Sequence, residues 1–223
     1  MLQSSRLVTL TGSGGIGKTR LALQAAGELL DTYHDGVWWV ELATLRDPAL
    51  VVQAIAKIMG VREIPHQPLV ETLTVSLCAK QMLLLLDSCE HLISACAQLA
   101  DRLLGACQNL NILATSREPL DIVGETIWPV PSLSLPDLHE SFTAQAVSKF
   151  ESIRLFTNRA TAVQPGFELT DQNSVAVTQI CRRLSGIPLA IELAAARVKM
   201  LSVDEVAQRL DDRFDLLTGG SRT

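Results

Sequence analysis

The stretch from Gly12 to Thr19 has the residue types and spacing that phosphate binding requires. It matches the pattern G-x-x-x-x-G-K-[ST], in which glycines let backbone N–H groups approach a phosphate closely. The lysine of this pattern reaches the β- and γ-phosphates, and the hydroxyl after it ligates Mg²⁺. We therefore predict that Lys18 binds phosphate and that Thr19 binds the metal ion. The predicted nucleotide-binding positions here are Gly12, Gly14, Gly15, Ile16, Gly17, Lys18, Thr19 and Arg20.

The residues around this motif predict the elements that it needs. Residues 7–10 form an apolar run typical of a buried strand. A helix beginning near Gly17 would add its positive N-terminal end to the phosphate site. The alternative is a glycine-rich turn followed by a chance Lys-Thr pair, and the flanking elements argue against it. The helix shows two adjacent apolar faces, with Leu21, Ala25 and Leu29 on one and Ala22, Ala26 and Leu30 on the next.

A second anchor is the run of leucines that ends in Asp87. Residues 82–87 predict a central parallel strand that is covered on both faces. The carboxyl end of such a strand lies where ligands bind in open α/β sheets, so we predict that Asp87 holds the Mg²⁺ shell. The alternative is a cap for the next helix, which Ser88 could supply instead. Glu90 either polarises water or lies in the first turn of that helix for electrostatic reasons.

An arginine follows the next predicted strand, residues 109–114, after a Thr-Ser pair. If this strand neighbours the strand before the phosphate motif, Arg117 lies near the phosphates. A guanidinium suits a multi-oxygen anion, so Arg117 could sense the γ-phosphate. The alternative is a surface arginine that caps the sheet. The predicted catalytic residues are Lys18, Asp87, Glu90 and Arg117.

Strand and helix patterns alternate through residues 1–131. The remaining strands are predicted at 36–42 and 125–130, and the remaining helices at about 49–59, 70–80 and 90–105. This order predicts an α/β fold, a parallel P-loop NTPase sheet with helices on both faces. In the last helix, Cys96 is expected in the core.

The composition changes at residues 131–136, which we interpret as a linker. Residues 132–223 carry no strand signal and predict a small all-helical domain. Thr170 is the expected N-cap of one helix, and Ser202 with Glu205 fits a capping box for the last one. An apolar helical face is predicted from Phe150, Ile153, Phe156, Ala160 and Val163.

The bulk properties exclude several classes of protein. The 223 residues are 48% hydrophobic, which allows a sizeable core, yet no apolar run approaches the roughly 20 residues of a membrane span. A net charge of -5 argues against a dominant nucleic-acid-binding face. The five cysteines form no C-x-x-C pair and the histidines no metal-ligand spacing, so we expect reduced thiols in a cytoplasmic protein without zinc. The first five residues lack the apolar region of a signal peptide.

Taken together, these motifs make the chain resemble the STAND class of P-loop ATPases, the NB-ARC-type modules of bacterial signalling and transcriptional regulators. The resemblance covers nearly the whole chain and rests on four motifs in the order typical of that family. They are residues 7–19, 84–92 (Leu-Leu-Leu-Asp-Ser-Cys-Glu-His-Leu), 114–120 (Ala-Thr-Ser-Arg-Glu-Pro-Leu) and 186–194 (Gly-Ile-Pro-Leu-Ala-Ile-Glu-Leu-Ala).

The resemblance implies a P-loop core with an attached, ARC-like helical domain, and adenine as the base. It also implies that Pro188 contacts adenine or ribose and that Arg117 reads the γ-phosphate; read alone, Gly186 to Leu189 is simply a helix start. The family module is a switch, closed with ADP and open and oligomerising with ATP. The partners implied are ATP or ADP with Mg²⁺, other domains of a longer regulator and a nucleotide-dependent homo-oligomer. We expect no direct nucleic acid contact and no membrane contact by this segment.

Three departures from the family qualify these expectations. The chain lacks the Gly-Arg-Glu segment that precedes the P-loop strand and the winged-helix piece that follows, so we expect truncation at both ends and an incomplete ADP lock. Ser88 stands where many relatives place an acid directly after the strand Asp, which predicts slow Mg²⁺-dependent hydrolysis at most. The alternative function is an active P-loop ATPase or small-molecule phosphotransferase. A GTPase is disfavoured because no Asn-Lys-x-Asp motif is present.

Overall fold

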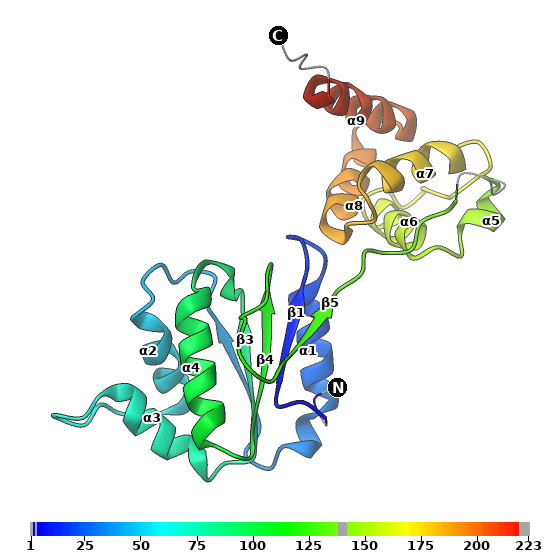
Figure 1. Cartoon of the computed structure of the whole chain (residues 1–223). Coiled ribbons are helices and arrows are strands. Elements are labelled where there is room, and N and C mark those ends of the chain that lie inside the picture. Colours follow the sequence, from blue (N-terminus) through cyan, green and yellow to red (C-terminus); the bar gives the residue numbers. More distant parts are fainter. Residues whose placement is uncertain (1, 3, 138–141, 219–223) are drawn as a thin grey trace. The chain divides into compact units, whose positions relative to one another are not determined.

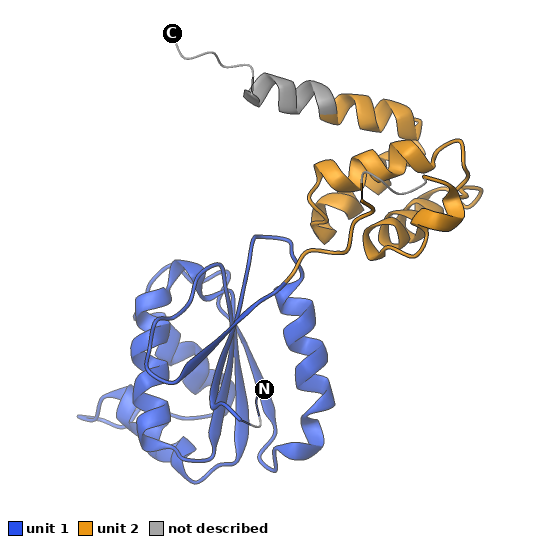
Figure 2. Cartoon of the chain, turned by 45° about the vertical axis from the view of Figure 1, so that its right-hand side comes forward, with its two compact units in different colours: residues 1–130 blue, residues 131–223 orange. Residues whose placement is uncertain are grey.

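The computed structural model describes residues 2, 4–137 and 142–218, with side chains as far as residue 210. The chain forms two compact units, residues 1–130 and residues 131–223, which Figure 2 distinguishes by colour. The first unit contains a sheet and the helices that cover it. In the second unit, helices are the only regular elements among the described residues.

The sheet of the first unit has five strands among the described residues, and all its pairings are parallel (Figure 1). The strand order is β2-β3-β4-β1-β5, so β1, which precedes the phosphate motif, lies between β4 and β5. All parallel strands end at the same edge, which brings their following residues together. The strands are β1 (Leu7–Thr11), β2 (Val37–Glu41), β3 (Met82–Asp87), β4 (Leu110–Ser116) and β5 (Glu125–Pro129).

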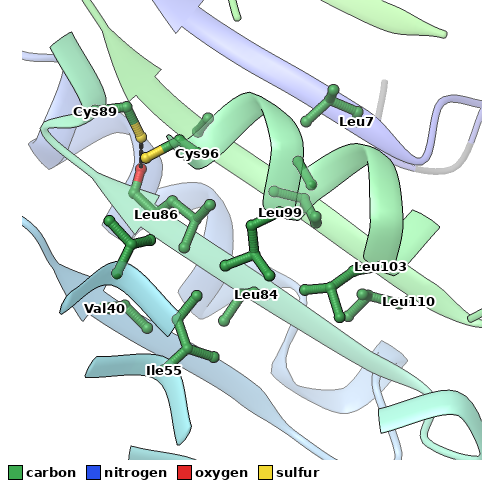
Figure 3. Close-up of a cluster of buried hydrophobic side chains, with 14 of the residues drawn as sticks. Leu7, Val40, Ile55, Leu84, Leu86, Cys89, Cys96, Leu99, Leu103 and Leu110 are labelled. Atoms are coloured by element: carbon green, nitrogen blue, oxygen red, sulfur yellow. Dashed lines mark hydrogen bonds between the residues drawn. The ribbon is translucent and has the colours of Figure 1, made fainter. Parts of the chain in front are cut away.

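Helices cover both faces of this sheet, as predicted. On one face α2, α3 and α4 pack against alternate strand residues such as Leu84 and Leu86, which Figure 3 shows beside Leu99 and Leu103 of α4. On the other face α1 covers the intervening residues, including Leu83. Every residue of β3 is buried because both of its faces are covered. The helices are α1 (Lys18–Glu28), α2 (Leu50–Met59), α3 (Leu69–Cys78) and α4 (Ile93–Ala106).

The helix α1 uses its alanine face for this contact. Ala22 and Ala26 are buried, whereas Leu21, on the adjacent predicted face, is 40% exposed. Two alanines allow α1 to approach the sheet closely, and the predicted leucine face therefore lies at the edge of that contact. A short 3₁₀ helix, η1 (Leu30–Thr32), follows α1.

The helix predicted to begin at Glu90 begins slightly later. A 3₁₀ turn, η2 (Cys89–His91), precedes α4. Cys96 is buried in α4, as predicted. Ser88 occupies the N-cap position of η2 with φ +67°, and its side chain makes no capping hydrogen bond.

The second unit packs its helices around a separate apolar core. Phe156 is fully buried and contacts Phe167 edge to face, with ring centroids 6.1 Å apart. Ile153 and Ala160, from the predicted apolar face, are buried beside it. The helices are α5 (Ala144–Val147), α6 (Glu151–Val163), α7 (Ser174–Arg183), α8 (Pro188–Ala195), η3 (Ala196–Lys199) and α9 (Val203–Thr218).

The two predicted caps in this unit have different outcomes. The capping box is confirmed, because Ser202 N–H donates to Glu205 Oε2 at 2.7 Å and Glu205 N–H donates to Ser202 Oγ at 3.2 Å. The prediction for Thr170 was wrong, because α7 begins three residues after the expected start. The side chain of Asn173 instead accepts from Thr170 N–H at 2.9 Å, which forms a turn before the helix.

Residues 131–136, predicted as a linker, are bound into the second unit. Ser134 Oγ accepts from Glu151 N–H at 3.0 Å, and the Ser152 hydroxyl donates to the Ser134 carbonyl at 2.7 Å. Leu133 N–H donates to the carbonyl of Gly186 at 3.0 Å. This segment is therefore part of the helical unit and shares its core.

Candidate functional site

The phosphate motif joins β1 to α1 at the carboxyl edge of the sheet (Figure 1). Gly17 is the N-cap of α1 with φ +102°, a conformation that a residue with a Cβ rarely adopts. The first N–H groups of a helix have no partner within the helix, so those of α1 are available to an anion. The helix thus begins directly after the glycines of the motif, as phosphate binding by its N–H groups would require.

The side chain of Lys18 lies folded against its own loop. Its Nζ donates to the carbonyls of Gly12 at 2.8 Å and Ser13 at 3.0 Å, and the residue is 9% exposed. Burial lowers the pKa of Lys18, the positive charge of Arg117 lowers it further, and Glu90 opposes both. Contact with a phosphate would require the ammonium to exchange these two carbonyls for phosphate oxygens.

Two threonines hold the carboxylate of Asp87. Thr19 Oγ1 donates to Asp87 Oδ1 at 2.8 Å, and Thr115 Oγ1 donates to the same oxygen at 2.6 Å. Thr115 in turn accepts from Ser88 N–H at 2.9 Å. Asp87 is 4% exposed, so this network orients a nearly buried carboxylate at the end of β3.

The two oxygens of Thr19 and Asp87 form a donor pair that suits Mg²⁺. Hydroxyl and carboxylate oxygens are hard ligands, and Mg²⁺ retains several waters and phosphate oxygens in nucleotide sites. Within the described residues no group of three or more His, Cys, Asp or Glu side chains could hold a metal ion.

Arg117 and Glu90 form an ion pair beside the phosphate loop. Arg117 Nε lies 3.5 Å from Glu90 Oε1, with side chains that are 67% and 26% exposed. A Cβ placed on Gly14 would lie 3.7 Å from a terminal nitrogen of Arg117, so the guanidinium lies against the loop. The pairing of β4 with β1, with Ser116 opposite Thr11, brings the arginine there.

The second carboxylate oxygen of Glu90, Oε2, is buried and has no hydrogen-bond partner among the described residues. Such an atom is costly to leave unsatisfied, so it marks a position where a water molecule or a ligand donor would bind. Its residue lies in η2, directly after the turn at Ser88. Lys18, Thr19, Asp87, Glu90 and Arg117 thus gather at one edge of the sheet.

The remaining predicted positions are placed differently. Arg20 lies in the first turn of α1 with an exposed side chain, and the Ile16 side chain is buried. Pro188 is the first residue of α8 in the second unit. Its predicted nucleotide contact therefore stays a prediction.

Two residues outside the predicted set, Thr115 and His91, also support the site. Thr115 could have been found from strand register, because Leu86 pairs with Ala114 and places the next residues, Asp87 and Thr115, side by side. His91 Nε2 lies 3.1 Å from the Leu42 carbonyl and 2.6 Å from that of Leu45. Carbonyl oxygens only accept, so the single Nε2–H is shared between the two. His91 thereby ties the loop after β2 to η2, and no local pattern indicated that contact.

The described residues contain no helix that combines the length and the apolar character needed to cross a bilayer.

Comparison with known proteins identifies what this chain resembles. The sequence model of the NB-ARC domain family matches residues 1–118 of this chain. A protein of Mycobacterium tuberculosis strain H37Rv named "Putative HTH-type transcriptional regulator" is 46% identical over 222 residues, which is all of this chain and 24% of that protein. An uncharacterized protein of the same strain is 41% identical over 221 residues, or 99% of this chain and 53% of that protein.

The chain therefore spans between a quarter and about half of the length of these relatives. Among solved structures, it is similar to a signal transduction ATPase with numerous domains (STAND) from Pyrococcus horikoshii that has a tetratricopeptide repeat sensor. The TM-score is 0.54 at 14% identity, over 94% of this chain and 30% of that one, so this likeness concerns the fold. The matched residues contain the P-loop, the strand that ends in Asp87 and strands β1 to β4 of the parallel sheet, and the chain belongs to the NB-ARC domain family.

Proposed function

We propose that this chain is an adenine-nucleotide switch module, which binds ATP or ADP with Mg²⁺ within a longer regulator. The observation that carries the proposal is the gathering of Lys18, Thr19, Asp87 and Arg117 at one sheet edge. The α1 N–H groups and Lys18 would bind the β-phosphate, and Thr19 and Asp87 would hold Mg²⁺. Bound Mg²⁺ would neutralise phosphate charge in that position.

The ion pair between Arg117 and Glu90 supports a role in telling ATP from ADP. The guanidinium lies against the phosphate loop and is largely exposed, so its pairing with Glu90 is weak, on the order of 0–1 kcal/mol. A γ-phosphate would offer more acceptor oxygens than Glu90 does and would draw the guanidinium away. ADP lacks that group, so the two nucleotides would leave Arg117 in different positions. A difference of this kind can bias a two-state element.

Slow hydrolysis at most fits the same geometry. The residue after Asp87 is Ser88, which cannot act as a carboxylate base, and Glu90 is engaged by Arg117. The alternative function, an active ATPase or phosphotransferase, is favoured by one observation. Glu90 Oε2 is buried and unpartnered among the described residues, and it could accept a proton from a water molecule once a ligand is bound.

The partners proposed are the other domains of a longer regulator and, with nucleotide, further copies of this chain. The relatives extend well beyond the matched region, and one is named as a transcriptional regulator of the HTH type. We assign DNA binding to such other domains and a cytoplasmic location to the protein. A salt-sensitive mobility shift of DNA with this chain alone would contradict that assignment.

Calorimetric titration with ADP and with a slowly hydrolysed ATP analogue, with and without Mg²⁺, tests the proposal. Lys18→Ala should reduce affinity about 10-fold or more, since a charge-assisted phosphate contact contributes roughly 1.5–3 kcal/mol. Lys57→Ala, which removes an exposed lysine from α2, is the matched control and should bind as the wild type does. Binding by Lys18→Ala at wild-type affinity would contradict the site.

The rate of ATP hydrolysis distinguishes the proposed switch function from the alternative, an active ATPase. The switch predicts slow release of phosphate, dependent on Mg²⁺ and lost in Lys18→Ala. Rapid turnover in the wild type that Glu90→Gln abolishes would favour the alternative. Turnover that persists in Lys18→Ala would rule out both.

A further inference from the structure

Two cysteines far apart in the sequence meet at the end of the first unit away from the nucleotide site. Cys78 is the last residue of α3, and Cys107 is the C-cap of α4. Their sulfur atoms lie 3.2 Å apart. The next strands, β3 and β4, start only a few residues later, so the pair lies at the amino ends of the strands (Figure 1). The phosphate loop, Asp87 and Arg117 follow the carboxyl ends.

The two sulfur atoms are close enough for a disulfide to form. A disulfide bond is about 2.05 Å long and needs the two Cβ atoms roughly 3.5–4.5 Å apart. Sulfur atoms 3.2 Å apart can reach bonding distance through small side-chain rotations, because α3 already packs on α4. The two thiols also contact the opposite backbone, since Cys78 Sγ donates to the Ala106 carbonyl at 3.5 Å and Cys107 Sγ to that of Thr74 at 3.6 Å.

The two thiols differ in how accessible they are. Cys78 is partly exposed, whereas Cys107 is fully buried. Burial, followed by the hydrogen bond to Cys78, raises the pKa of Cys107 to about 12. Because Cys78 alone of the two reaches solvent, a small oxidant would meet Cys78 first. Cys107 would then be the resolving thiol because its sulfur lies 3.2 Å away, although its raised pKa slows that step.

We propose that Cys78 and Cys107 are a reversible redox pair, which a peroxide converts into an intramolecular disulfide. The Cys78 thiolate attacks the O–O bond, which forms a sulfenic acid and releases hydroxide. Cys107 sulfur then attacks the Cys78 sulfur, the S–O bond breaks, and the departing hydroxide takes the Cys107 proton as water. Two thiols and one peroxide yield one disulfide and two waters. A dithiol reductant restores the thiols by exchange.

The consequence is a change in stability with the nucleotide site left intact. The bond would join positions 29 residues apart and close a loop that contains β3 and α4. Such a cross-link stabilises the folded state mainly because it restricts the unfolded chain. Since the pair and the phosphate loop lie at opposite strand ends, nucleotide affinity should not change when the bond forms.

A second cysteine pair provides an internal control. Cys89 and Cys96 point toward one another near the start of α4 (Figure 3), and the Cys96 thiol raises the pKa of Cys89. Both residues are fully buried. In both pairs the two thiols lie close together. Of these four thiols, only that of Cys78 is accessible to solvent. The folded chain should oxidise at the first pair and spare the second.

The test treats the folded chain with hydrogen peroxide, blocks remaining thiols with an alkylating agent after unfolding, and maps the peptides by mass. The expected product is a monomer that has lost two hydrogen atoms and carries a peptide linked through Cys78 and Cys107. Its melting temperature should rise by about 5 °C or more and return on reduction with dithiothreitol. Cys78→Ser and Cys107→Ala should each abolish the rise, whereas Cys181→Ser should retain it.

Three results would overturn the proposal. One is a linked peptide that joins Cys89 to Cys96 instead. Another is wild-type Cys78 that, after peroxide treatment, is found as a sulfinic acid, in a disulfide between two chains, or unmodified. The third is a rise in melting temperature that persists in Cys78→Ser. Peptide mapping uses the wild type, so the result does not depend on how well a variant folds.

Discussion

The guanidinium Nε of Arg117 lies 3.5 Å from Oε1 of Glu90, and the same guanidinium rests against Gly14 of the phosphate loop. This relationship joins the residues after β3 and β4 to the loop after β1. It places an exposed positive charge between a carboxylate and the position expected for a γ-phosphate. The exchange of Arg117 between these two anions is the step on which the proposed switch depends.

Replacement of Arg117 by alanine should reduce the preference for ATP over ADP. The variant loses the group that would contact only the γ-phosphate, so ATP affinity should fall about 10-fold or more while ADP affinity stays near the wild-type value. Competition titrations with the two nucleotides measure the ratio. Arg102→Ala is the matched control, because Arg102 also forms a 3.5 Å ion pair, with Glu71 on the surface. An equal loss for both nucleotides would contradict the sensor role.

Thr115→Val should destabilise the chain and weaken Mg²⁺-dependent binding. The change keeps the shape of a buried side chain but removes the donor to Asp87 and the acceptor for Ser88 N–H. The expected loss is about 1–3 kcal/mol in the free energy of unfolding, measured with urea.

Thr9→Val is the control for this change. Thr9 is also fully buried, on the neighbouring strand β1, and its hydroxyl has no hydrogen-bond partner among the described residues. Its removal should leave stability unchanged or raise it, because an unsatisfied polar group is lost. Equal destabilisation by the two substitutions would show that the Thr115 hydroxyl has no special role.

Gly186→Ala should strongly destabilise the helical unit. Gly186 has φ +67°, and an added Cβ would lie 2.5 Å from the carbonyl oxygen of Leu133. Backbone strain alone costs roughly 1–3 kcal/mol, and the clash would separate residues 131–136 from the turn before α8. Gly166→Ala, where the added Cβ meets open space, should change thermal stability little. Similar melting temperatures for the two variants would contradict this role of Gly186.

Alkaline pH should destabilise the second unit through Cys181. Burial raises the pKa of this thiol from 9.0 to about 12. Between these values the unfolded chain loses a proton that the folded chain keeps, so stability present below pH 9 falls as the pH rises. The slope from one such thiol approaches about 1.4 kcal/mol per pH unit.

Urea titrations followed by circular dichroism between pH 8 and the alkaline limit of folding measure this slope. Cys181→Ala should have a shallower decline than the wild type, whatever its stability at pH 8. The pKa of Cys107 is also raised to about 12, so Cys107 adds its own alkaline loss of stability. That loss is the same in the wild type and in Cys181→Ala, and it therefore cancels when the two slopes are compared. Parallel curves would show that Cys181 does not drive the alkaline loss.

Much of the fold followed from local pattern. The buried run before Asp87, the glycines before Lys18 and the strand-helix alternation predicted the parallel sheet with helices on both faces, and the sheet has that form. One error was local too. Thr170 lost the cap position to Asn173, whose side chain accepts from the Thr170 N–H. Of the two apolar faces predicted for α1, the one with Ala22 and Ala26 packs on the sheet, and only tertiary contacts could decide between them.

The sequence by itself determined which chemistry is present: backbone donors of the glycine loop, an ammonium at Lys18, a hydroxyl at Thr19 and a carboxylate at Asp87. Only the tertiary structure decided which of these groups meet. The order β2-β3-β4-β1-β5 and its register place Thr115 on Asp87 and Arg117 beside Glu90, and the packing of α3 on α4 joins Cys78 to Cys107. The hydrophobic periodicity of a segment indicates which of its faces is buried. Which residues distant in sequence come into contact depends instead on how the buried faces of different segments pack and in what register.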